Sequence, residues 1–168
     1  MKDKGSISNE PLVCFFLHLR FDLVYICAMI DQKFIDFIND HHVLILSTVK
    51  EGQPYTANCF YVYLPEQNMF VFTSDKETRH GSEMLENPNV GANIVLETKA
   101  IGKIQGLQIM GEAKPLEGQE LKKGKLAYLK AYPYAVLKLE TMWGLKANFL
   151  KLTDNRLGFG KKLIWEIV

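Results

Sequence analysis

A lysine, an arginine and a histidine follow directly on a short apolar run in the stretch FVFTSDKETRHG, residues 70–81. The apolar residues predict the end of a strand, and Ser74 or Asp75 can cap the helix that comes next. The first N–H groups of a helix have no partner within it, and the helix dipole is positive at that end, so anions bind there. With Lys76 and Arg79 beside them, these groups predict a phosphate site.

The same two cations allow a second interpretation, in which Lys76 and Arg79 are solvated surface residues paired with Glu77 and Glu83. The residues alone leave both interpretations open. The formal net charge is +1, from 20 Lys and Arg against 19 Asp and Glu. Nucleic-acid binding depends on clustered Lys and Arg, so we expect no nucleic-acid partner, and any bound anion should be small.

The cysteines and histidines match no disulfide framework and no metal motif. The cysteines are odd in number, which favours a reducing, cytoplasmic location. The histidines lack a Cys or carboxylate partner at ligand spacing, so we expect no metal site. The residues concerned are Cys14, Cys27, Cys59, His18, His41, His42 and His80.

The elements that must position the phosphate site follow from periodicity and turn residues. A chain of 168 residues, 48% hydrophobic, is expected to form one domain. Gly106 and Gly111 mark bulges or close backbone approach. Antiparallel strands with short helices in the connections favour a small Greek-key barrel. The pattern predicts helices over residues 31–40, 76–87 and 117–132, and strands over residues 43–49, 54–63, 69–73, 90–96, 104–112 and 143–153.

The first 28 residues differ from the rest of the chain. Residues 11–30 are largely apolar, but Arg20 and Asp22 near the middle argue against a membrane-spanning helix. A signal peptide is also not expected, because no small-x-small cleavage pattern follows the apolar run. Met29 as the natural start, with residues 1–28 an N-terminal extension outside the core fold, is the preferred interpretation. The alternative is an amphipathic segment that packs on the domain.

Several motifs occur together after Met29: FTS at 72–74, TRH at 78–80, NPNV at 87–90, GLQIMGEA at 106–113 and TDNRLGFGKKLIW at 153–165. In this order they resemble the pyridoxamine 5′-phosphate oxidase-like FMN-binding split barrel, and more narrowly its YhbP-like branch. The resemblance implies a mainly β domain over residues 29–168. Its expected architecture is a six-stranded antiparallel Greek-key split barrel with short flanking helices.

The resemblance also implies which residues hold FMN. The second strand should lie along the flavin ring with Tyr55, Thr56, Ala57 and Asn58. The ribityl phosphate should be held by Thr73, Ser74, Lys76, Arg79 and His80. The GLQ strand should bring Gly106, Leu107 and Gln108 near the flavin. Residues late in the chain should complete the pocket across a homodimer, namely Lys161, Lys162 and Trp165.

An FMN-dependent oxidoreductase that acts on an unknown small-molecule substrate or electron donor is the function that the resemblance implies. The chain lacks the Arg-x-His-x-Arg-like motif that recognises pyridoxine phosphate in the true oxidases, so pyridoxal phosphate synthesis is not expected. No residue is singled out as catalytic. The alternative is a non-catalytic flavin- or haem-binding module, because one fold serves several functions.

Overall fold

The structure is a computed structural model of the 168-residue chain, and it describes residues 30–167. The N-terminal extension proposed for residues 1–28 lies outside the described residues. The helices are α1 (Gln32–Asn39), α2 (Arg79–Glu86) and α3 (Gly118–Ala131), with short 3-10 turns at Pro65–Gln67, Ile101–Lys103, Pro133–Lys138 and Asn155–Leu157. The strands are β1 (Val43–Lys50), β2 (Gln53–Leu64), β3 (Met69–Thr73), β4 (Asn89–Val95), β5 (Gln105–Pro115), β6 (Met142–Asp154) and β7 (Lys162–Glu166).

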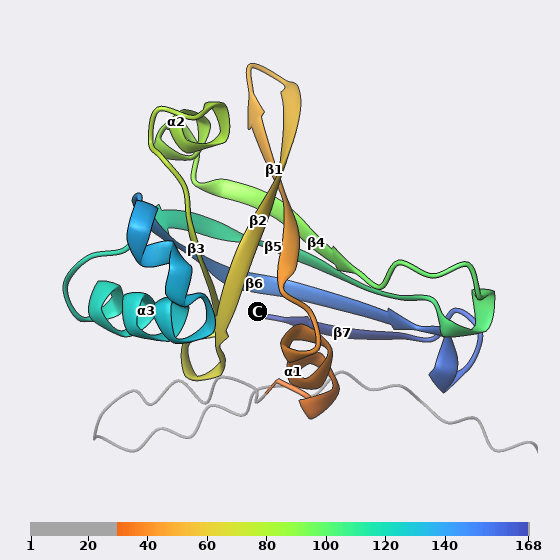
Figure 1. The fold of residues 1–168 in the computed structure, drawn as a ribbon. Helices are drawn as coiled ribbons and strands as arrows, with labels where there is room; N and C mark the ends of the chain where they lie inside the picture. The colour runs from red at the N-terminus through yellow and green to blue at the C-terminus, as the bar shows by residue number, and fades with distance from the viewer. Residues whose placement is uncertain (1–29, 168) are drawn as a thin grey trace, which may run out of the picture.

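Seven antiparallel strands form one sheet in the order β3-β2-β1-β4-β5-β6-β7, and β3 also pairs with β6. That extra pairing closes six strands into a barrel and leaves β7 outside the ring. The beginning of β6, Met142–Lys146, pairs with β3, whereas its second half, Phe149–Thr153, pairs with β7. The predicted six-stranded Greek-key barrel is therefore confirmed, with a seventh strand added (Figure 1).

The hairpin of β1 and β2 rises beside α2 at one end of the barrel (Figure 1). Its two-residue turn is Glu51 and Gly52, and both have positive φ, at 51° and 76°. Such a turn matches the right-handed twist of the two strands. Residues 55–58, which are expected along the flavin ring, lie in this hairpin. Tyr55 thereby comes next to the start of α2.

Gly111 lies at an irregularity in the pairing of β5 with β6, where the register shifts after Met110. A Cβ at Gly111 would collide with the carbonyl oxygen of Lys146, so only glycine fits. The expected bulge is confirmed there. At Gly106 a Cβ would meet nothing closer than the Ile94 carbonyl oxygen, at 3.6 Å, which is an ordinary contact.

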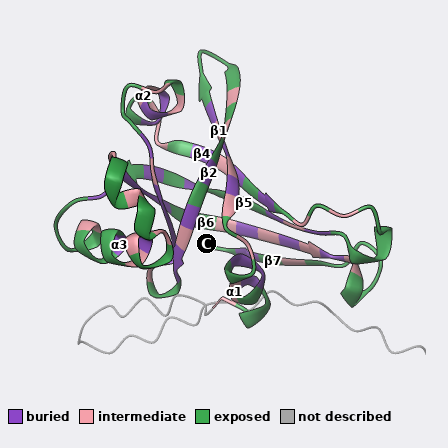
Figure 2. Cartoon of the chain, viewed as in Figure 1, coloured by how far each residue is buried: buried purple, intermediate pink, exposed green. Residues whose placement is uncertain are grey.

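Buried residues alternate along the strands (Figure 2), and most of the buried hydrophobic side chains form one main core cluster. Phe34, Phe37 and Ile38 of α1 join this main cluster. A second cluster lies under α3 and includes Tyr128. Trp143 is fully buried, and its Nε1 donates a hydrogen bond to the carbonyl oxygen of Ser74, 3.0 Å away. The buried Trp143 therefore fixes the backbone at Ser74, where the chain leaves β3 toward α2.

Candidate functional site

The helix α2 begins one turn later than the sequence predicts. Its N-cap is Thr78, whose Oγ1 accepts a hydrogen bond from the N–H of Gly81. Ser74 and Asp75 are not the cap: the Asp75 carboxylate instead accepts from the N–H of Glu77, and its carbonyl accepts from the Thr78 hydroxyl. This local turn competes with the helix and delays its start. Lys76 consequently lies in the turn before α2.

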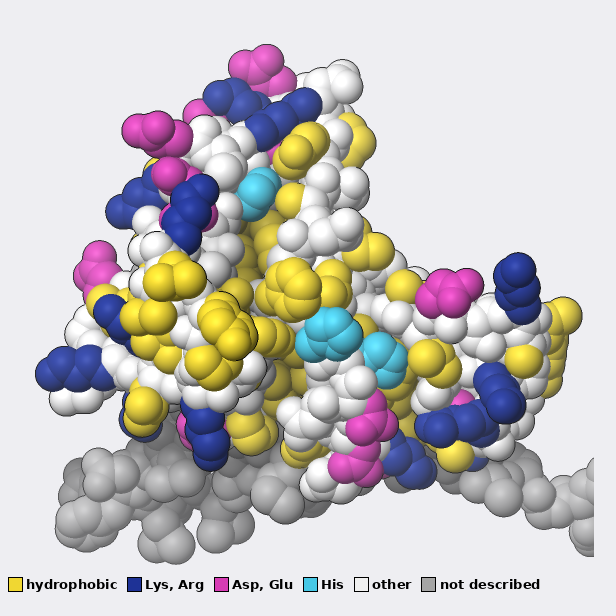
Figure 3. Space-filling view, in the orientation of Figure 1, with side chains coloured by type: hydrophobic (Ala, Val, Ile, Leu, Met, Phe, Trp, Pro, Cys, Tyr) yellow, Lys and Arg dark blue, Asp and Glu magenta, His cyan; other side chains and the backbone are white. Residues whose placement is uncertain are grey.

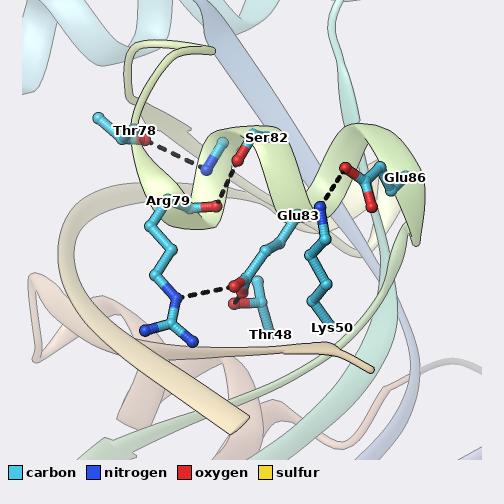
Figure 4. Close-up of polar contacts among 8 residues, drawn as sticks. Thr48, Lys50, Thr78, Arg79, Ser82, Glu83 and Glu86 are labelled. Atoms are coloured by element: carbon cyan, nitrogen blue, oxygen red, sulfur yellow. Dashed lines mark hydrogen bonds and ion pairs between the residues drawn. The ribbon is translucent and has the colours of Figure 1, made fainter. Parts of the chain in front are cut away.

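Arg79, the first residue of α2, is held from two sides. Its guanidinium carbon lies 4.6 Å from the centroid of the Tyr55 ring, and its Nε donates a 2.9 Å hydrogen bond to the Glu83 carboxylate. Figure 4 shows this contact and the Thr48 hydroxyl beside the same carboxylate. Within the described residues the two terminal nitrogens of Arg79 have no acceptor. They are free to bind an external anion.

Glu83 is a buried carboxylate, with a side chain only 3% exposed. The Thr48 hydroxyl donates to it across 2.5 Å, and Thr48 is itself buried. The hydrogen bond from Arg79, followed by that from Thr48, lowers the pKa of Glu83 below its usual value of 4.5. The carboxylate is therefore ionised at neutral pH and pairs with Arg79. Of the two pairs in the second interpretation of the sequence this one is present, but Glu83 is buried, and Lys76 is not paired with Glu77 among the described residues.

His80, the second residue of α2, contacts Tyr55 of β2 and Ser74, which follows β3. Its ring is stacked with that of Tyr55, with centroids 6.3 Å apart, and its Nε2 is 2.7 Å from the Ser74 hydroxyl. Burial lowers the pKa of His80 below its usual value of 6.5, so the imidazole is neutral at pH 7. We call Tyr55, Ser74, Arg79, His80 and Glu83 the α2 cluster.

Two further residues expected near the phosphate lie beside this cluster. The Thr73 hydroxyl donates to the Thr141 carbonyl oxygen at 3.3 Å and is half-buried. Lys76 is exposed and has no ion-pair partner within the described part of the chain. The structure thus places all five residues expected at the phosphate around one corner of the fold.

A row of outward-facing residues, most of them polar, crosses the outer face of the sheet. Asn58 in β2 lies opposite Ile45 in β1. Ile45 in turn lies opposite Asn93, which lies opposite Gln108 in β5. Residues opposite each other share a face, so these side chains all point outward with Thr56. Two of the residues expected along the flavin ring and the expected Gln108 are therefore on one continuous surface.

Ala57 and Leu107 lie on the opposite, inner face, because strand residues alternate. Ala57 is half-buried, and Leu107 is completely buried in the core. Gly106 lies on the outer face, opposite Val95. Only the main chain of Leu107 is thus available to a ligand on the outer face.

The late residues expected in the pocket are far from the α2 cluster within one chain. Lys162 lies opposite Thr153 at the end of β6, and Lys161 precedes it. This is the end of the barrel opposite α2 (Figure 1). Trp165 lies in the main core cluster and is 8% exposed. A single chain does not bring these residues to Arg79.

Two concave regions occur elsewhere on the described surface. A groove of about 470 Å³ lies between the end of α1, the last residues of β2 and α3, and it includes His41, His42, Tyr61 and Tyr132. Figure 3 shows hydrophobic side chains gathered in the middle of this face and charged ones mostly at its rim. A smaller cavity of about 120 Å³ lies near Asp154 and Arg156. Neither is lined by residues of the α2 cluster.

Residues 30–167 hold no cluster of metal ligands and no membrane-spanning helix. No group of three or more His, Cys, Asp or Glu side chains there could hold a metal ion. No helix in that range is long and apolar enough to cross a bilayer. Cys59 is a buried thiol whose pKa burial raises to about 11, so it is not an activated nucleophile.

Sequence reasoning missed the parts of the site that lie behind Arg79. Glu83 entered only as a surface partner, and Thr48 did not enter at all. The i,i+4 spacing of Arg79 and Glu83 signals their pairing. Nothing local in the sequence signals Thr48, because it comes from β1 and meets α2 only through the packing of the fold.

The closed ring of six strands, the added strand and the polar corner at α2 define a split barrel with one candidate anion site. A family model described as pyridoxamine 5′-phosphate oxidase matches residues 30–147. A UPF0306 protein of Photorhabdus laumondii is 37% identical over 130 residues, which cover 77% of this chain and 91% of the relative. The chain belongs to the pyridoxamine 5′-phosphate oxidase-like superfamily, in its YhbP-like branch.

Solved structures with low sequence identity share the fold. A heme binding protein from Mycobacterium smegmatis superimposes with a TM-score of 0.67 at 20% identity, covering 77% of this chain and 55% of that one. A FAD-binding protein from Mesorhizobium loti gives 0.61 at 14% identity, covering 73% and 92%. At identities this low, the similarity shows a shared fold only. The ligand must be inferred from the residues of the site.

Proposed function

We propose that the protein binds FMN and holds its phosphate at the α2 cluster. The observation that carries this proposal is Arg79, whose Nε is fixed by Glu83 while both terminal nitrogens stay free. Planar guanidinium groups with two free donors suit phosphate oxygens. Lys76 adds a second cation, and the first N–H groups of α2 add neutral donors. These donors fit a phosphate monoester.

The flavin ring would run along β2 from Tyr55, at the α2 cluster, toward Asn58, whose side chain lies on the outer face of the sheet with Gln108. This face also carries exposed apolar residues, which include Phe60, Met110 and Ile164. We propose that a second copy of the chain covers it. The family resemblance implies that Lys161 and Lys162 also contact the flavin. Because they lie at the other end of the barrel, they could do so only from a partner. A homodimer would thus complete the site.

Bound FMN would supply electron or hydride transfer, and the chain would supply binding, orientation and a cavity for a small-molecule substrate or electron donor. The proposed activity is that of an FMN-dependent oxidoreductase. We expect it in a reducing cytoplasm, in keeping with the free thiol of Cys59.

The absorption spectrum of the purified protein tests the cofactor, since flavin bands support FMN. Titration with FMN and with riboflavin tests the phosphate site, and tighter binding of FMN is expected. Activity is tested by anaerobic stopped-flow: NADH or NADPH should bleach bound FMN faster than free FMN. Equal rates would contradict a nicotinamide-dependent reductase.

A second candidate is a non-catalytic flavin- or haem-binding module. One observation favours haem: His41 lines the 470 Å³ groove, and its Nδ1 is 2.7 Å from the Phe37 carbonyl oxygen. A hydrogen bond at Nδ1 fixes the tautomer in which Nε2 can bind iron. A Soret band that is lost in His41→Ala would support this candidate. Flavin bands without a Soret band would exclude the haem-binding version.

A further inference from the structure

We propose that Glu83, itself held by Thr48, is a positioning residue that fixes Arg79 for a phosphate monoester. The inference rests on the proposed phosphate site and concerns residues that no ligand can touch. Glu83 is 3% exposed and Thr48 is 1% exposed, so both lie behind the guanidinium. Any effect they have on the ligand passes through Arg79.

Tyr55, Glu83 and Thr48 each restrict the position of the Arg79 side chain in a different way. The ring of Tyr55 limits how far the guanidinium can move along one direction, and Glu83 accepts from Nε. Thr48 donates to the same carboxylate from β1, which ties α2 to the hairpin (Figure 4). The arginine therefore presents its two terminal nitrogens in one orientation before any ligand arrives. Ordering a long side chain in advance removes a cost that binding would otherwise incur.

The charge of Glu83 acts in the opposite sense to its geometry. A carboxylate close to the site repels an anion, so a purely electrostatic effect of removing it would tighten binding. Loss of orientation would weaken binding. The two effects have opposite signs, and this makes the role of Glu83 measurable.

The experiment compares the affinities of full-length variants for FMN and for riboflavin, which lacks the phosphate. Glu83→Ala should weaken FMN binding by about tenfold, as expected when one long side chain must be ordered on binding. Glu83→Gln keeps an acceptor for Nε and should stay within about twofold of the wild type. Riboflavin affinity should not change in either variant.

Substitutions of Thr48 test the same role and are expected to disturb folding less than Glu83→Ala. Thr48→Val removes one hydrogen bond without changing shape, and FMN binding should weaken by about threefold. Thr48→Ser should restore it. The matched control is Glu86→Ala, which removes an exposed carboxylate that also joins α2 to β1, through Lys50. This variant should bind FMN like the wild type.

A second readout separates this inference from the proposed function. In the apo protein the side-chain Nε–H signal of Arg79 should be protected from exchange, and Glu83→Ala and Thr48→Val should remove that protection. If the wild type does not prefer FMN over riboflavin, the phosphate site is refuted, and the exchange data still decide whether Arg79 is fixed. If FMN is preferred but Glu83→Ala binds it equally well or more tightly, the positioning role is overturned.

Discussion

Two arginines at opposite ends of the barrel each meet a buried carboxylate, and they use it differently. At the end of β6, Arg156 donates to Asp154 through Nε, through a terminal nitrogen at 2.8 Å and through its own backbone N–H. Gln105 donates to the same carboxylate from β5. At α2, Arg79 gives Glu83 only its Nε. Both arginine side chains are about half-exposed, with exposed fractions of 60% and 54%.

The difference lies in how many donors remain. Asp154 and Arg156 are two residues apart in one turn, so the guanidinium can fold onto the carboxylate and satisfy it. Arg79 and Glu83 are one helical turn apart, and the Tyr55 ring stands beside the guanidinium. The first pair therefore closes a turn of the fold. The second pair leaves the two terminal nitrogens of Arg79 at the surface in a fixed orientation, and a phosphate site requires such donors.

The largest effect, on FMN affinity, is expected when the ammonium group of Lys76 and the free terminal nitrogens of Arg79 are removed. Replacing Lys76 and Arg79 together by Ala should weaken FMN binding by about 3 kcal/mol or more, since each charge-assisted hydrogen bond contributes about 1.5–3 kcal/mol. Riboflavin binding should change much less. Isothermal titration with both ligands measures the difference.

Arg156→Ala is the matched control for this prediction, because it removes an arginine paired with a buried carboxylate at the other end of the barrel. It should leave the affinity for FMN unchanged. If it weakens FMN binding as much as the double variant, or if the double variant loses FMN and riboflavin equally, the contrast between the two arginines does not hold.

A smaller effect, on stability, is expected from Asp154→Ala. The change removes the acceptor of Gln105, which is buried, and of the Arg156 backbone N–H. Leaving these donors unpaired should lower the free energy of unfolding by about 2 kcal/mol. Urea unfolding measures the loss, and Asp154→Asn, which keeps one acceptor, should lose less. An unchanged unfolding midpoint would show that this turn does not depend on its carboxylate.

The smallest effect is a dependence on pH that the two pairs share. Hydrogen bonds from Arg79 and from Arg156 are the main causes that lower the pKa of Glu83 and of Asp154 below their usual 4.5 and 3.8. A carboxylate with a lowered folded pKa stabilises the protein above its unfolded pKa, and this stability is lost as the pH falls through the folded pKa.

The unfolding midpoints of the wild type, Glu83→Gln and Asp154→Asn should therefore converge in acid. Convergence for Glu83→Gln should begin below about pH 4.5, and for Asp154→Asn at lower pH, below about 3.8. Urea titrations between pH 7 and pH 3 test this. Differences that stay constant over the whole range would show that neither carboxylate is stabilised by its arginine.

Most of the fold could be predicted because its signals are local. The turn at Glu51 and Gly52 and the alternation on either side of it identify the first hairpin. The strand β7 was missed because its five residues follow two glycines and are placed by pairing with β6. That pairing depends on residues distant in sequence, and no local pattern reveals it.

The candidate site could be predicted only in part, for the same reason. Arg79 and His80 were found because they follow a strand and open a helix. The cap was assigned to Ser74 or Asp75 because all short polar residues there can cap, and the turn that selects Thr78 depends on hydrogen bonds around Asp75. Glu83 needed the fold as well, since its burial follows from the contact of α2 with β1.

The pairing of β3 with β6 has a consequence for how the chain folds. It places Phe70 opposite Leu145, whereas β1 and β2 are joined by a turn of two residues. Bringing distant segments together loses more chain entropy than forming a hairpin, so contacts of this kind slow folding. We expect the sequential pairs β1–β2–β3 and β4–β5–β6 to form first. The pairing of β3 with β6 should form last. Pulse-labelled hydrogen exchange would show its amides protected after those of β1 and β2, and the Ser74 corner, which leaves the end of β3, would become ordered only with that final step.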